Sequence, residues 1–466
     1  MDQKELKREI LSDPFLSKLS SLAKEMGVPL FLVGGYIRDL FFGLESRDYD
    51  LALPEEHASF THVIEDTFHL HFFKIGKEEM GTVAYRAIKE EISIDLTLFK
   101  EKTVEEDLER RDFTLNATAF SLRDETFHSV EGALEDIDKR VIRTVSEQSI
   151  DRDPLRMLRA IRYLCTLDGL LIDLELKEEI CQKKEKIQDL PGERIRMELD
   201  QILLSRRPGA GIRALYELGL LFVLMPELKG LENLGQNEHH HLDVLSHTFL
   251  TIEKISWAMD WIVQNGRRLS LSDDDRLSLY YASLFHDIGK QDSYSKDEKG
   301  RVHFYYHEAR SSQKAEQIME RLRFSNSMMR KVLRLIENHM RILNLSRETK
   351  ETALKRLVNQ ISNESPLLVV LTLADKEASR GVLSIQIDEV VENHCLRVLD
   401  LFEEKDLVHP PPLITGHDVM ALGYRSGPRV GQILSFIREK QVEGEIRTRE
   451  EALEILRQRF GQSGEQ

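Results

Sequence analysis

The chain has 466 residues, 41% of them hydrophobic and 31% charged, a composition typical of a globular protein with several domains. Lysine and arginine number 65 against 81 aspartate and glutamate residues; the resulting net charge of −16 excludes an indiscriminate nucleic-acid coat. The N-terminal sequence lacks a signal peptide's apolar core, no run is long enough to span a membrane, and three scattered cysteines predict reduced thiols. We therefore expect a cytoplasmic protein with no membrane segment.

Changes in pattern along the chain predict four regions. The first mixes strand-like and helical segments, whereas helical spacing dominates the rest. A run of three prolines that ends at Pro412 marks the last boundary. We expect an α+β head at 1–145, an all-α neck at 146–228, an all-α domain rich in histidine at 229–408 and an all-α tail at 409–466.

Residues 31–50 contain the first candidate site. An apolar run of strand length ends at Gly34 and Gly35, and helical spacing follows. Two glycines at such a junction let the backbone approach a bulky anion, and the helix N-terminus offers unpaired N–H groups to a phosphate. Arg38, about one turn into the helix, adds a cation.

Three carboxylates are expected near this turn. Asp48 and Asp50 lie two apart in an extended segment and point to one face. Strands are predicted at 69–75, 82–88 and 91–99, and in the last of these Asp95 lies opposite the apolar face. Three such carboxylates would hold the divalent ions, here expected to be Mg²⁺, of a phosphoryl displacement. Each feature alone is also common at ordinary turns and exposed strand ends.

A charged stretch at 105–117 follows the last of these strands. If residues 112–120 form a helix, Asp112 and Asn116 share one face, with Arg111 beside them. These side chains are suited to a ribose hydroxyl and a phosphate.

Together, these motifs resemble the head of the class II tRNA nucleotidyltransferase and bacterial poly(A) polymerase family. They are Gly34-Gly35-x-x-Arg38-Asp39, Asp48-x-Asp50 and Arg110-Arg111-Asp112-Phe113-Thr114-x-Asn116-Ala117, in the family's order. The resemblance implies a nucleotidyltransferase-type mixed sheet flanked by helices, with tRNA, CTP and, in some members, ATP as substrates. It also implies catalysis by Asp48, Asp50 and Asp95 and nucleotide binding by Gly34, Gly35, Arg38, Arg111, Asp112 and Asn116.

The neck contains a second arginine-rich helix. Asp153 before Pro154 is typical of a helix N-terminus, and an arc of arginines follows at 156, 159 and 162. The spacing alone fits equally a cap with surface arginines or a nucleotide site. In the family that this stretch resembles, the matching Asp and first Arg read the incoming base. The resemblance therefore assigns nucleotide binding to Asp153, Arg156, Arg159 and Arg162, although Arg152 replaces the glutamate of many CCA-adding members.

The link between strand and charged stretch is short. Only Lys100 to Val104 separate Phe99 from Glu105. Family members that add the terminal A resemble one another in carrying a longer flexible loop there. The short link therefore resembles the branch that adds only CC, and full CCA addition remains the alternative.

The histidine-rich region has ordered metal ligands. His286-Asp287 precedes Ile-Gly-Lys, His247 lies upstream and Asp375 downstream. This order resembles the HD phosphohydrolase superfamily, whose matching residues bind a divalent metal of an identity that the sequence does not give. His307 and His339 would complete a second ion site.

Two rival functions remain at this stage. One is a metal phosphohydrolase acting on RNA ends with an inactive head, and the other is a non-catalytic RNA-binding protein. Both predict eroded ligands in the head, whereas Asp48, Asp50 and Arg38 are present.

Overall fold

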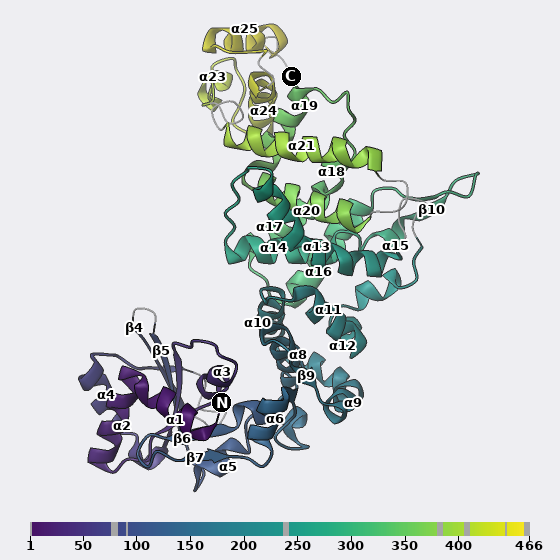
Figure 1. The fold of residues 1–466 in the computed structure, drawn as a ribbon. Coiled ribbons are helices and arrows are strands. Elements are labelled where there is room, and N and C mark those ends of the chain that lie inside the picture. Colours follow the sequence, from purple (N-terminus) through teal and green to yellow (C-terminus); the bar gives the residue numbers. More distant parts are fainter. Residues whose placement is uncertain are drawn as a thin grey trace. The chain divides into compact units, whose positions relative to one another are not determined.

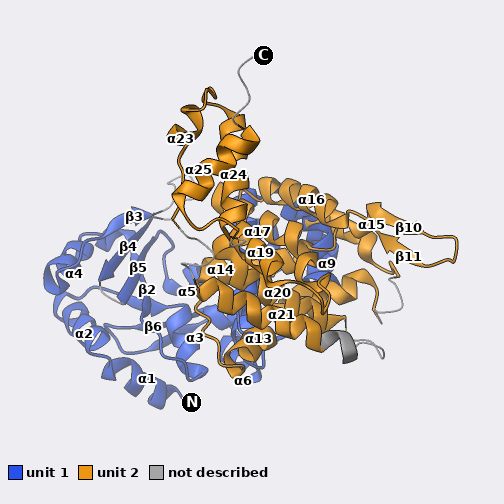
Figure 2. Ribbon diagram, turned by 90° about the horizontal axis from the view of Figure 1, so that it is seen from above, with its two compact units in different colours: residues 1–206, 214–224 blue, residues 207–213, 225–466 orange. Residues whose placement is uncertain are grey.

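A computed structural model gives the fold and describes residues 2–75, 83–89, 92–235, 242–379, 385–404, 411–442 and 445–460. The chain passes from an α+β region into helices, as the sequence predicts (Figure 1). It divides into two compact units, residues 1–206 with 214–224 and residues 207–213 with 225–466 (Figure 2). The boundary predicted between 408 and 409 lies outside the described residues.

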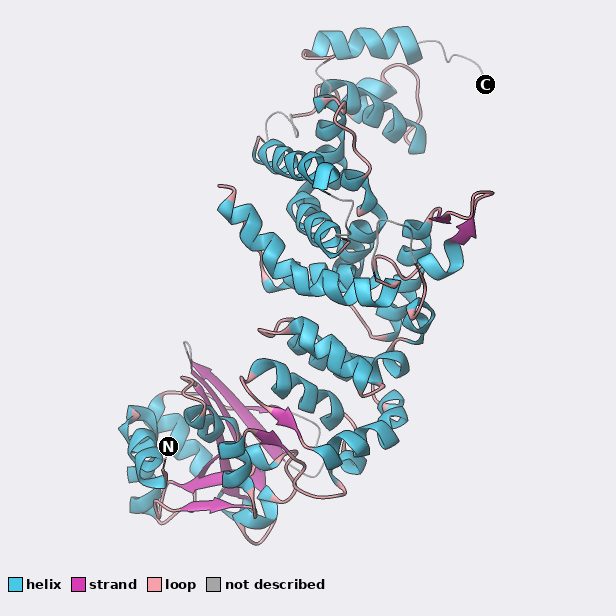
Figure 3. Ribbon diagram, turned by 45° about the vertical axis from the view of Figure 1, so that its right-hand side comes forward, coloured by secondary structure: helices cyan, strands magenta, loops and turns pink. Residues whose placement is uncertain are grey.

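A seven-stranded mixed sheet forms the head (Figure 3). Its strand order is β3-β4-β5-β2-β1-β6-β7, and only β2 and β5 pair in parallel. The strands are β1 (Phe31–Val33), β2 (Asp48–Pro54), β3 (Phe73–Ile75), β4 (Val83–Lys89), β5 (Ile92–Phe99), β6 (Thr118–Ser121) and β7 (Phe127–Ser129).

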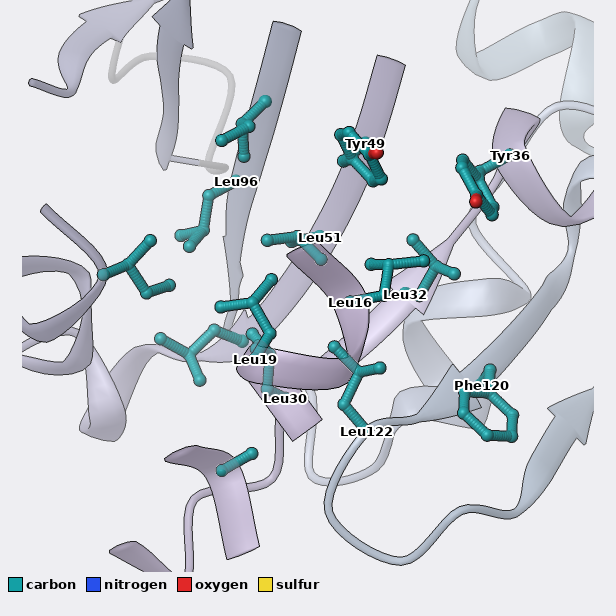
Figure 4. Packing of buried hydrophobic residues seen from close by; sticks show 14 of the residues in the cluster. Leu16, Leu19, Leu30, Leu32, Tyr36, Tyr49, Leu51, Leu96, Phe120 and Leu122 are labelled. Atoms are coloured by element: carbon teal, nitrogen blue, oxygen red, sulfur yellow. The ribbon is translucent and has the colours of Figure 1, made fainter. Parts of the chain in front are cut away.

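Alternation along the central strands separates the core from the polar face. In β2, Tyr49, Leu51 and Leu53 are buried in the main apolar cluster, so Asp48 and Asp50 point to the opposite face. The same rule applies to β5, where the predicted apolar face of Ile94, Leu96 and Leu98 packs into that cluster. Figure 4 shows Leu16 and Leu19 among Leu32, Leu51 and Leu96.

Two helices precede the sheet. α1 (Gln3–Ser12) ends before Asp13, whose Oδ1 accepts hydrogen bonds from the N–H groups of Phe15 and Leu16 and caps α2 (Pro14–Met26). Apolar side chains of both helices cover the sheet face that carries Tyr49. The other head helices are α3 (Gly35–Phe41), α4 (Phe60–Phe68), α5 (Val104–Leu108) and α6 (Ala133–Lys139).

Two local predictions were wrong. Residues 112–120 are not helical: a 3₁₀ turn at Thr114–Asn116 leads into β6, which pairs with β1. The strand predicted at 69–75 starts only at Phe73, because α4 runs to Phe68 and ends in a left-handed His69 with φ 54°. Thr82 and Glu91, at the ends of the other two predicted strands, lie outside the described residues.

The remaining elements are short or helical. After the head come α7 (Ser149–Arg152), α8 (Arg156–Thr166), α9 (Leu174–Lys183), α10 (Gly192–Leu203), α11 (Pro208–Glu217), α12 (Leu220–Leu224) and the two-stranded pair β8 (Val141–Ile142) and β9 (Leu171–Ile172).

The second unit is helical apart from one hairpin, β10 (Tyr294–Lys296) and β11 (Val302–Phe304). Its helices are α13 (Val244–Gln264), α14 (Asp273–Phe285), α15 (Lys290–Ser293), α16 (His307–Arg321), α17 (Asn326–Asn338), α18 (Met340–Leu343), α19 (Glu351–Ile361), α20 (Ser365–Ala378), α21 (Ile385–Glu403), α23 (Gly416–Met420), α24 (Pro428–Val442) and α25 (Arg449–Phe460). Within the described ranges, no helix combines the length and the apolar character that crossing a membrane requires.

Candidate functional site

A cavity of about 630 Å³ lies in the first unit and brings together the predicted head residues with most of those predicted in the neck. It is lined by twelve of these residues, nine of the head and three of the neck, namely Gly34, Gly35, Arg38, Asp48, Asp50, Asp95, Arg111, Asp112, Asn116, Asp153, Arg156 and Arg159. Sequence analysis did not assign a role to the further lining residues Tyr36, Asp39, Ser46, Tyr49, Arg86, Ser93 and Tyr163. The cavity therefore joins the glycine turn, the carboxylate strand and the arginine-rich helix of the neck.

The glycine turn is fixed by its contacts with the carboxylate strand. Gly34 has a positive φ of 72°, and a Cβ there would lie 3.0 Å from Asp50 Oδ2 and 3.1 Å from an Arg111 nitrogen. The Gly35 N–H donates to Asp50 Oδ2 at 3.3 Å. Burial raises the pKa of Asp50, against the lowering effect of this N–H. Glycine at position 34 thus allows the turn between β1 and α3 to approach the Asp50 carboxylate closely.

Asp95 reaches the cavity but is paired with an arginine. Asp50 lies opposite Asp95 in the parallel β2–β5 pairing, and Arg86 lies opposite Asp95 across β4–β5. The Arg86 Nε and Nη2 groups donate to the two Asp95 oxygens, each at 2.6 Å. Such a bidentate pair neutralises the charge of the third carboxylate and takes one acceptor site on each of its oxygens.

The three head carboxylates do not form a compact ligand cluster. Among the described residues, groups of three ligand atoms within 4.8 Å of one another occur at two places, and Asp48, Asp50 and Asp95 are not among them. Mg²⁺ usually binds one or two carboxylates together with waters and substrate phosphates. Asp48 and Asp50 fit that pattern, whereas Asp95 with its arginine does not add a third free ligand.

Arg38 is held at the cavity wall by three partners. Its Nη1 donates to Asn116 Oδ1 at 2.7 Å, and its Nη2 donates to Asp39 Oδ1 at 2.6 Å. The guanidinium also lies 5.0 Å from the ring centre of Tyr163, within cation–π range. These contacts leave the cation fixed beside the glycine turn.

Asp112 and Asn116 meet although they are not on a helix. The Asn116 amide donates to Asp112 Oδ1 at 2.9 Å and to the Tyr163 hydroxyl at 3.1 Å. Arg159 Nη2 of α8 lies 2.6 Å from Asp112 Oδ2. Burial alone would raise the pKa of Asp112, but Arg159 and the hydrogen bonds hold it below its ordinary value. A buried ion pair therefore joins head to neck within this unit.

Asp153 and Arg156, the pair expected to read the base, both form hydrogen bonds with other groups of the protein. Asp153 accepts from the Leu155 N–H at 3.2 Å and from Arg194 Nη2 at 2.9 Å. Arg156 donates to the Ser149 hydroxyl at 2.6 Å and to the backbone carbonyl of Arg110 at 2.7 Å. A carboxylate has about four acceptor sites and a guanidinium five donors, so both side chains keep bonding capacity toward a base.

Arg162 is the one predicted head or neck residue that does not line the cavity. Its Nε lies 3.4 Å from Glu198 Oε2 of α10, and its guanidinium packs 4.9 Å from the ring centre of Tyr163. At 3.6 residues per turn, Arg162 is rotated away from the face that carries Arg156. Tyr163, which sequence analysis passed over, lies between Arg162 and Arg38.

The face of β2 opposite the two aspartates is anchored by Asp13. Its Oδ2 accepts from the Tyr49 hydroxyl at 2.8 Å, and the Tyr36 hydroxyl lies 3.5 Å away. The two tyrosine rings stack with centres 5.3 Å apart. Tyr49 lies between Asp48 and Asp50, and Tyr36 follows Gly35, so one carboxylate connects α2 to both halves of the cavity.

A second cluster forms in the other unit and contains all the predicted HD residues. Ligand atoms of His247, His286 and Asp375 lie within 4.8 Å of one another, as do those of Asp287, His307 and His339. All six side chains are buried. They come from α13, α20, the ends of α14 and α17 and the start of α16.

Asp287 lies between the two halves of this cluster. Its Oδ2 is 3.2 Å from His286 Nε2 and 3.6 Å from His247 Nε2, whereas its Oδ1 is 3.4 Å from His307 Nε2. Ligand atoms about 2.1 Å from one ion would stand roughly 3.0–3.4 Å apart. A carboxylate with one oxygen toward each half is suited to bridge two cations.

Backbone contacts fix the histidine tautomers. His286, His307 and His339 have Nδ1 within 2.9 Å of a backbone carbonyl, at Ser283, Phe304 and Ile336. Each Nδ1 must therefore donate, which leaves the Nε2 lone pair toward the cluster. His307 Nε2 and His339 Nε2 are 3.2 Å apart, and two lone pairs so close fit a cation between them. Burial and the neighbouring histidines lower the pKa of His339 to about 3, which keeps it neutral.

The cluster is supported by a turn that needs glycine. A Cβ at Gly289 would lie 2.5 Å from both the His307 carbonyl and the Ser311 nitrogen, so only glycine lets the turn after Asp287 pack on α16. Lys290 Nζ lies 2.7 Å from Asp287 Oδ2. Burial would raise the pKa of Asp287, but His286 and Lys290 hold it well below its ordinary value.

Three family models match the chain. The model of the poly A polymerase head domain matches residues 30–143, and one named for RNA and SrmB binding in polymerase A matches residues 169–231. A model described as tRNA nucleotidyltransferase domain 2 matches residues 293–456.

Two curated relatives are similar over nearly their full length. An A-adding tRNA nucleotidyltransferase of Deinococcus radiodurans is 32% identical over 90% of this chain and 93% of its own length. A CC-adding tRNA nucleotidyltransferase of Thermus thermophilus is 32% identical over 91% of this chain and 92% of its own. Equal identity to both leaves the added nucleotide undecided.

Solved structures share the fold. The apo form of a CCA-adding enzyme matches with a TM-score of 0.67 and 21% identity, over 100% of this chain and 99% of that one. The Thermotoga maritima CCA-adding enzyme complexed with tRNA matches with a TM-score of 0.61 and 20% identity, over 99% of both chains. At such identities the likeness concerns the fold alone.

Proposed function

Because the chain belongs to the tRNA nucleotidyltransferase family, we propose that it adds cytidine nucleotides to the 3′ end of immature tRNA and stops after CC. The observation that supports an end of addition after CC is the short link from β5 to α5, which comprises only residues 100–103. Thr103 caps α5, and Glu101 pairs with Arg110, so the link is held at both ends. A segment so short and anchored has little room to re-aim the base-reading pair for ATP.

The cavity residues bind and orient the two substrates. The turn at Gly34 and Gly35 receives a phosphate on backbone N–H groups, while Arg38 and Arg111 neutralise the triphosphate. The tRNA 3′ oxygen then bonds to the α-phosphorus of CTP, and the bond from that phosphorus to the β-phosphate oxygen breaks, so pyrophosphate leaves. Asp112 and Asn116 orient the nucleotide against Arg159 of the neck.

Asp48 and Asp50 would hold Mg²⁺ at the reacting phosphate. Oxygen ligands on one strand face suit this ion, and the substrate phosphates would supply its remaining ligands. A Mg²⁺ ion held there would supply the positive charge that lowers the pKa of the attacking hydroxyl and balances the charge on the phosphates. Asp95 acts beside them through its pair with Arg86.

Base selection is assigned to Asp153 and Arg156. The carboxylate accepts from an exocyclic amine and the guanidinium donates to a ring nitrogen or carbonyl, a pattern that cytosine offers and uracil does not. Arg194 fixes Asp153, and the backbone around Arg110 fixes Arg156. Because Asp153 and Arg156 are each held by such partners, we expect the pair to recognise one type of base rather than to readjust for a second.

The test is primer extension with purified protein and Mg²⁺. Transcripts ending before CCA, after C and after CC are each offered CTP or ATP. We expect CTP to extend the first two to CC and ATP to leave the third unchanged. Incorporation of A onto the CC transcript would contradict the proposal and establish full CCA addition, or A addition if CTP is also refused.

A second activity is favoured by the buried ligand cluster. We propose that His247, His286, Asp287 and Asp375 bind one divalent ion and that Asp287, His307 and His339 bind another. Such ions lower the pKa of bound water and supply hydroxide for hydrolysis of a phosphate ester. Elemental analysis of the purified protein and turnover of p-nitrophenyl phosphate test this site. Absence of bound metal from protein grown with manganese, nickel and zinc would refute it.

A further inference from the structure

The hairpin β10–β11 exposes aromatic rings next to the ligand cluster. Tyr294, Tyr305 and Tyr306 are 43%, 65% and 82% exposed. Large aromatic side chains gain stability by burial, so three of them in water within thirteen residues contribute little to the fold. Exposure of this kind indicates an interaction surface.

Two rings on one face of the hairpin already stack. His303 and Tyr305 have ring centres 5.2 Å apart and planes only 11° from parallel. His303 lies in β11, and Tyr305 follows Phe304 in the turn that leads to α16, so the stacked pair lies at the end of the strand. Tyr294 and Phe304 are paired across the strands and make an edge contact of 5.9 Å.

Tyr306 projects from a strained backbone. Its φ of 60° and ψ of 26° are left-handed, which is rare for an aromatic residue. Such strain persists where the surroundings impose it, often at functional sites. The strain here orients the ring of the residue that directly precedes His307.

The base of the hairpin is fixed to the metal ligands. The Phe304 carbonyl accepts the hydrogen bond from His307 Nδ1 at 2.9 Å. Lys290 Nζ lies 5.4 Å from the Phe304 ring centre and 2.7 Å from Asp287 Oδ2. Consecutive Cα atoms are about 3.8 Å apart, and Tyr306 and Tyr305 lie one and two residues before the ligand His307, respectively.

We propose that this hairpin is a stacking platform for the single-stranded 3′ end of RNA, which presents its terminal phosphate to the buried ion cluster. The proposal rests on the hydrolytic site proposed above and names its substrate class. Successive aromatic faces accept successive bases, and stacking tolerates any sequence. A free mononucleotide would need one such face, whereas the His303–Tyr305 pair and Tyr306 offer two.

The experiment compares the full-length protein with the double variant Tyr305→Ala/Tyr306→Ala. The probe is a short single-stranded RNA with a 3′-phosphate, followed by phosphate release and by fluorescence anisotropy. Loss of one or two stacked bases should raise KM and the dissociation constant about 5- to 100-fold. Turnover of p-nitrophenyl phosphate and metal content should stay unchanged.

Matched controls use the same hairpin. Tyr305→Phe/Tyr306→Phe keeps both rings and should behave as the unsubstituted protein. Tyr294→Ala removes an aromatic ring from the other face and should retain RNA affinity. Equal loss in Tyr294→Ala, or equal loss with p-nitrophenyl phosphate, would overturn the proposal because the hairpin would then act through the fold.

Two further outcomes separate this proposal from the hydrolytic one. If the unsubstituted protein hydrolyses no phosphate ester, the hydrolytic site fails, and anisotropy alone still tests the platform. If a 3′-phosphorylated mononucleotide loses as much affinity as the RNA in the double variant, the ligand is a free nucleotide and the RNA platform is refuted. Unchanged RNA affinity refutes it as well.

Discussion

The head cavity and the buried ligand cluster arrange their candidate metal ligands in two different ways. In the cavity, Asp48 and Asp50 face an open polar space, and Asp95 is neutralised by Arg86. In the cluster, buried histidines and aspartates lie within ion-binding range of one another, with tautomers set by backbone carbonyls. The first site depends on its substrate for completion, whereas the second is organised before an ion arrives.

The largest effects should come from the carboxylates of the head. Asp48→Asn and Asp50→Asn each remove an anionic ligand, so CTP incorporation should fall about a thousandfold. Binding of tRNA and turnover of p-nitrophenyl phosphate should be retained, since neither depends on that strand face. Gel-based extension and the phosphatase assay on the same preparations measure both. Parallel loss of the two activities would mean that the substitution disrupts folding.

Metal removal should separate the two sites almost as strongly. Dialysis without chelator should strip Mg²⁺ from the head but leave ions in the buried cluster, because protein atoms alone supply the ligands there. Elemental analysis before and after dialysis measures retention. His307→Ala, compared with His417→Ala in the tail, should lower the retained content. Complete loss of metal on plain dialysis would show that both sites bind ions weakly.

A double-mutant cycle tests the ion pair between Asp95 and Arg86. If Asp95 acts through Arg86, Asp95→Ala and Arg86→Ala should each reduce extension about tenfold, and the double variant should be no slower than either. The Mg²⁺ concentration required for half-maximal rate should stay constant across the cycle. A large rise in that concentration for Asp95→Ala alone would instead make Asp95 a metal ligand.

The smallest expected effect concerns the anchor on the face of β2 opposite the two aspartates. Tyr49→Phe removes the hydroxyl that donates to Asp13, which should cost about 1 kcal/mol of unfolding free energy. Because Tyr49 lies between Asp48 and Asp50, the two proposed catalytic residues, kcat should also fall severalfold with KM unchanged. Urea unfolding and steady-state extension measure the two. Tyr36→Phe, whose hydroxyl is 3.5 Å from Asp13, is the control and should lose less.

Much of the head site could be predicted because its residues are close in sequence. Gly34, Gly35 and Arg38 share one turn, and a period of two places Asp48 and Asp50 on one face of β2. Those relations depend on local backbone geometry alone. The same holds for the apolar face of β5.

Partners across the sheet could not be predicted. Arg86 meets Asp95 only because β4 pairs with β5 in one register, and a shift of one residue would point Arg86 to the other face. Residues 118–121 form a strand instead of a helix because β1 offers them backbone hydrogen bonds, which outweigh a local charge pattern. Arg162 does not line the cavity and instead pairs with Glu198, a residue on another helix.

The sequence by itself determined which residues are candidates for the chemistry and that the protein has a mixed head followed by helices, since motif order and periodicity are local properties. Only the tertiary structure decided which candidate metal ligands lie close together. Asp287 lies near histidines that come from helices distant in the chain. The tertiary structure also leaves Tyr305 and Tyr306, which directly precede His307, exposed to solvent. Distances between residues far apart in sequence depend on packing and strand register, which no local pattern contains.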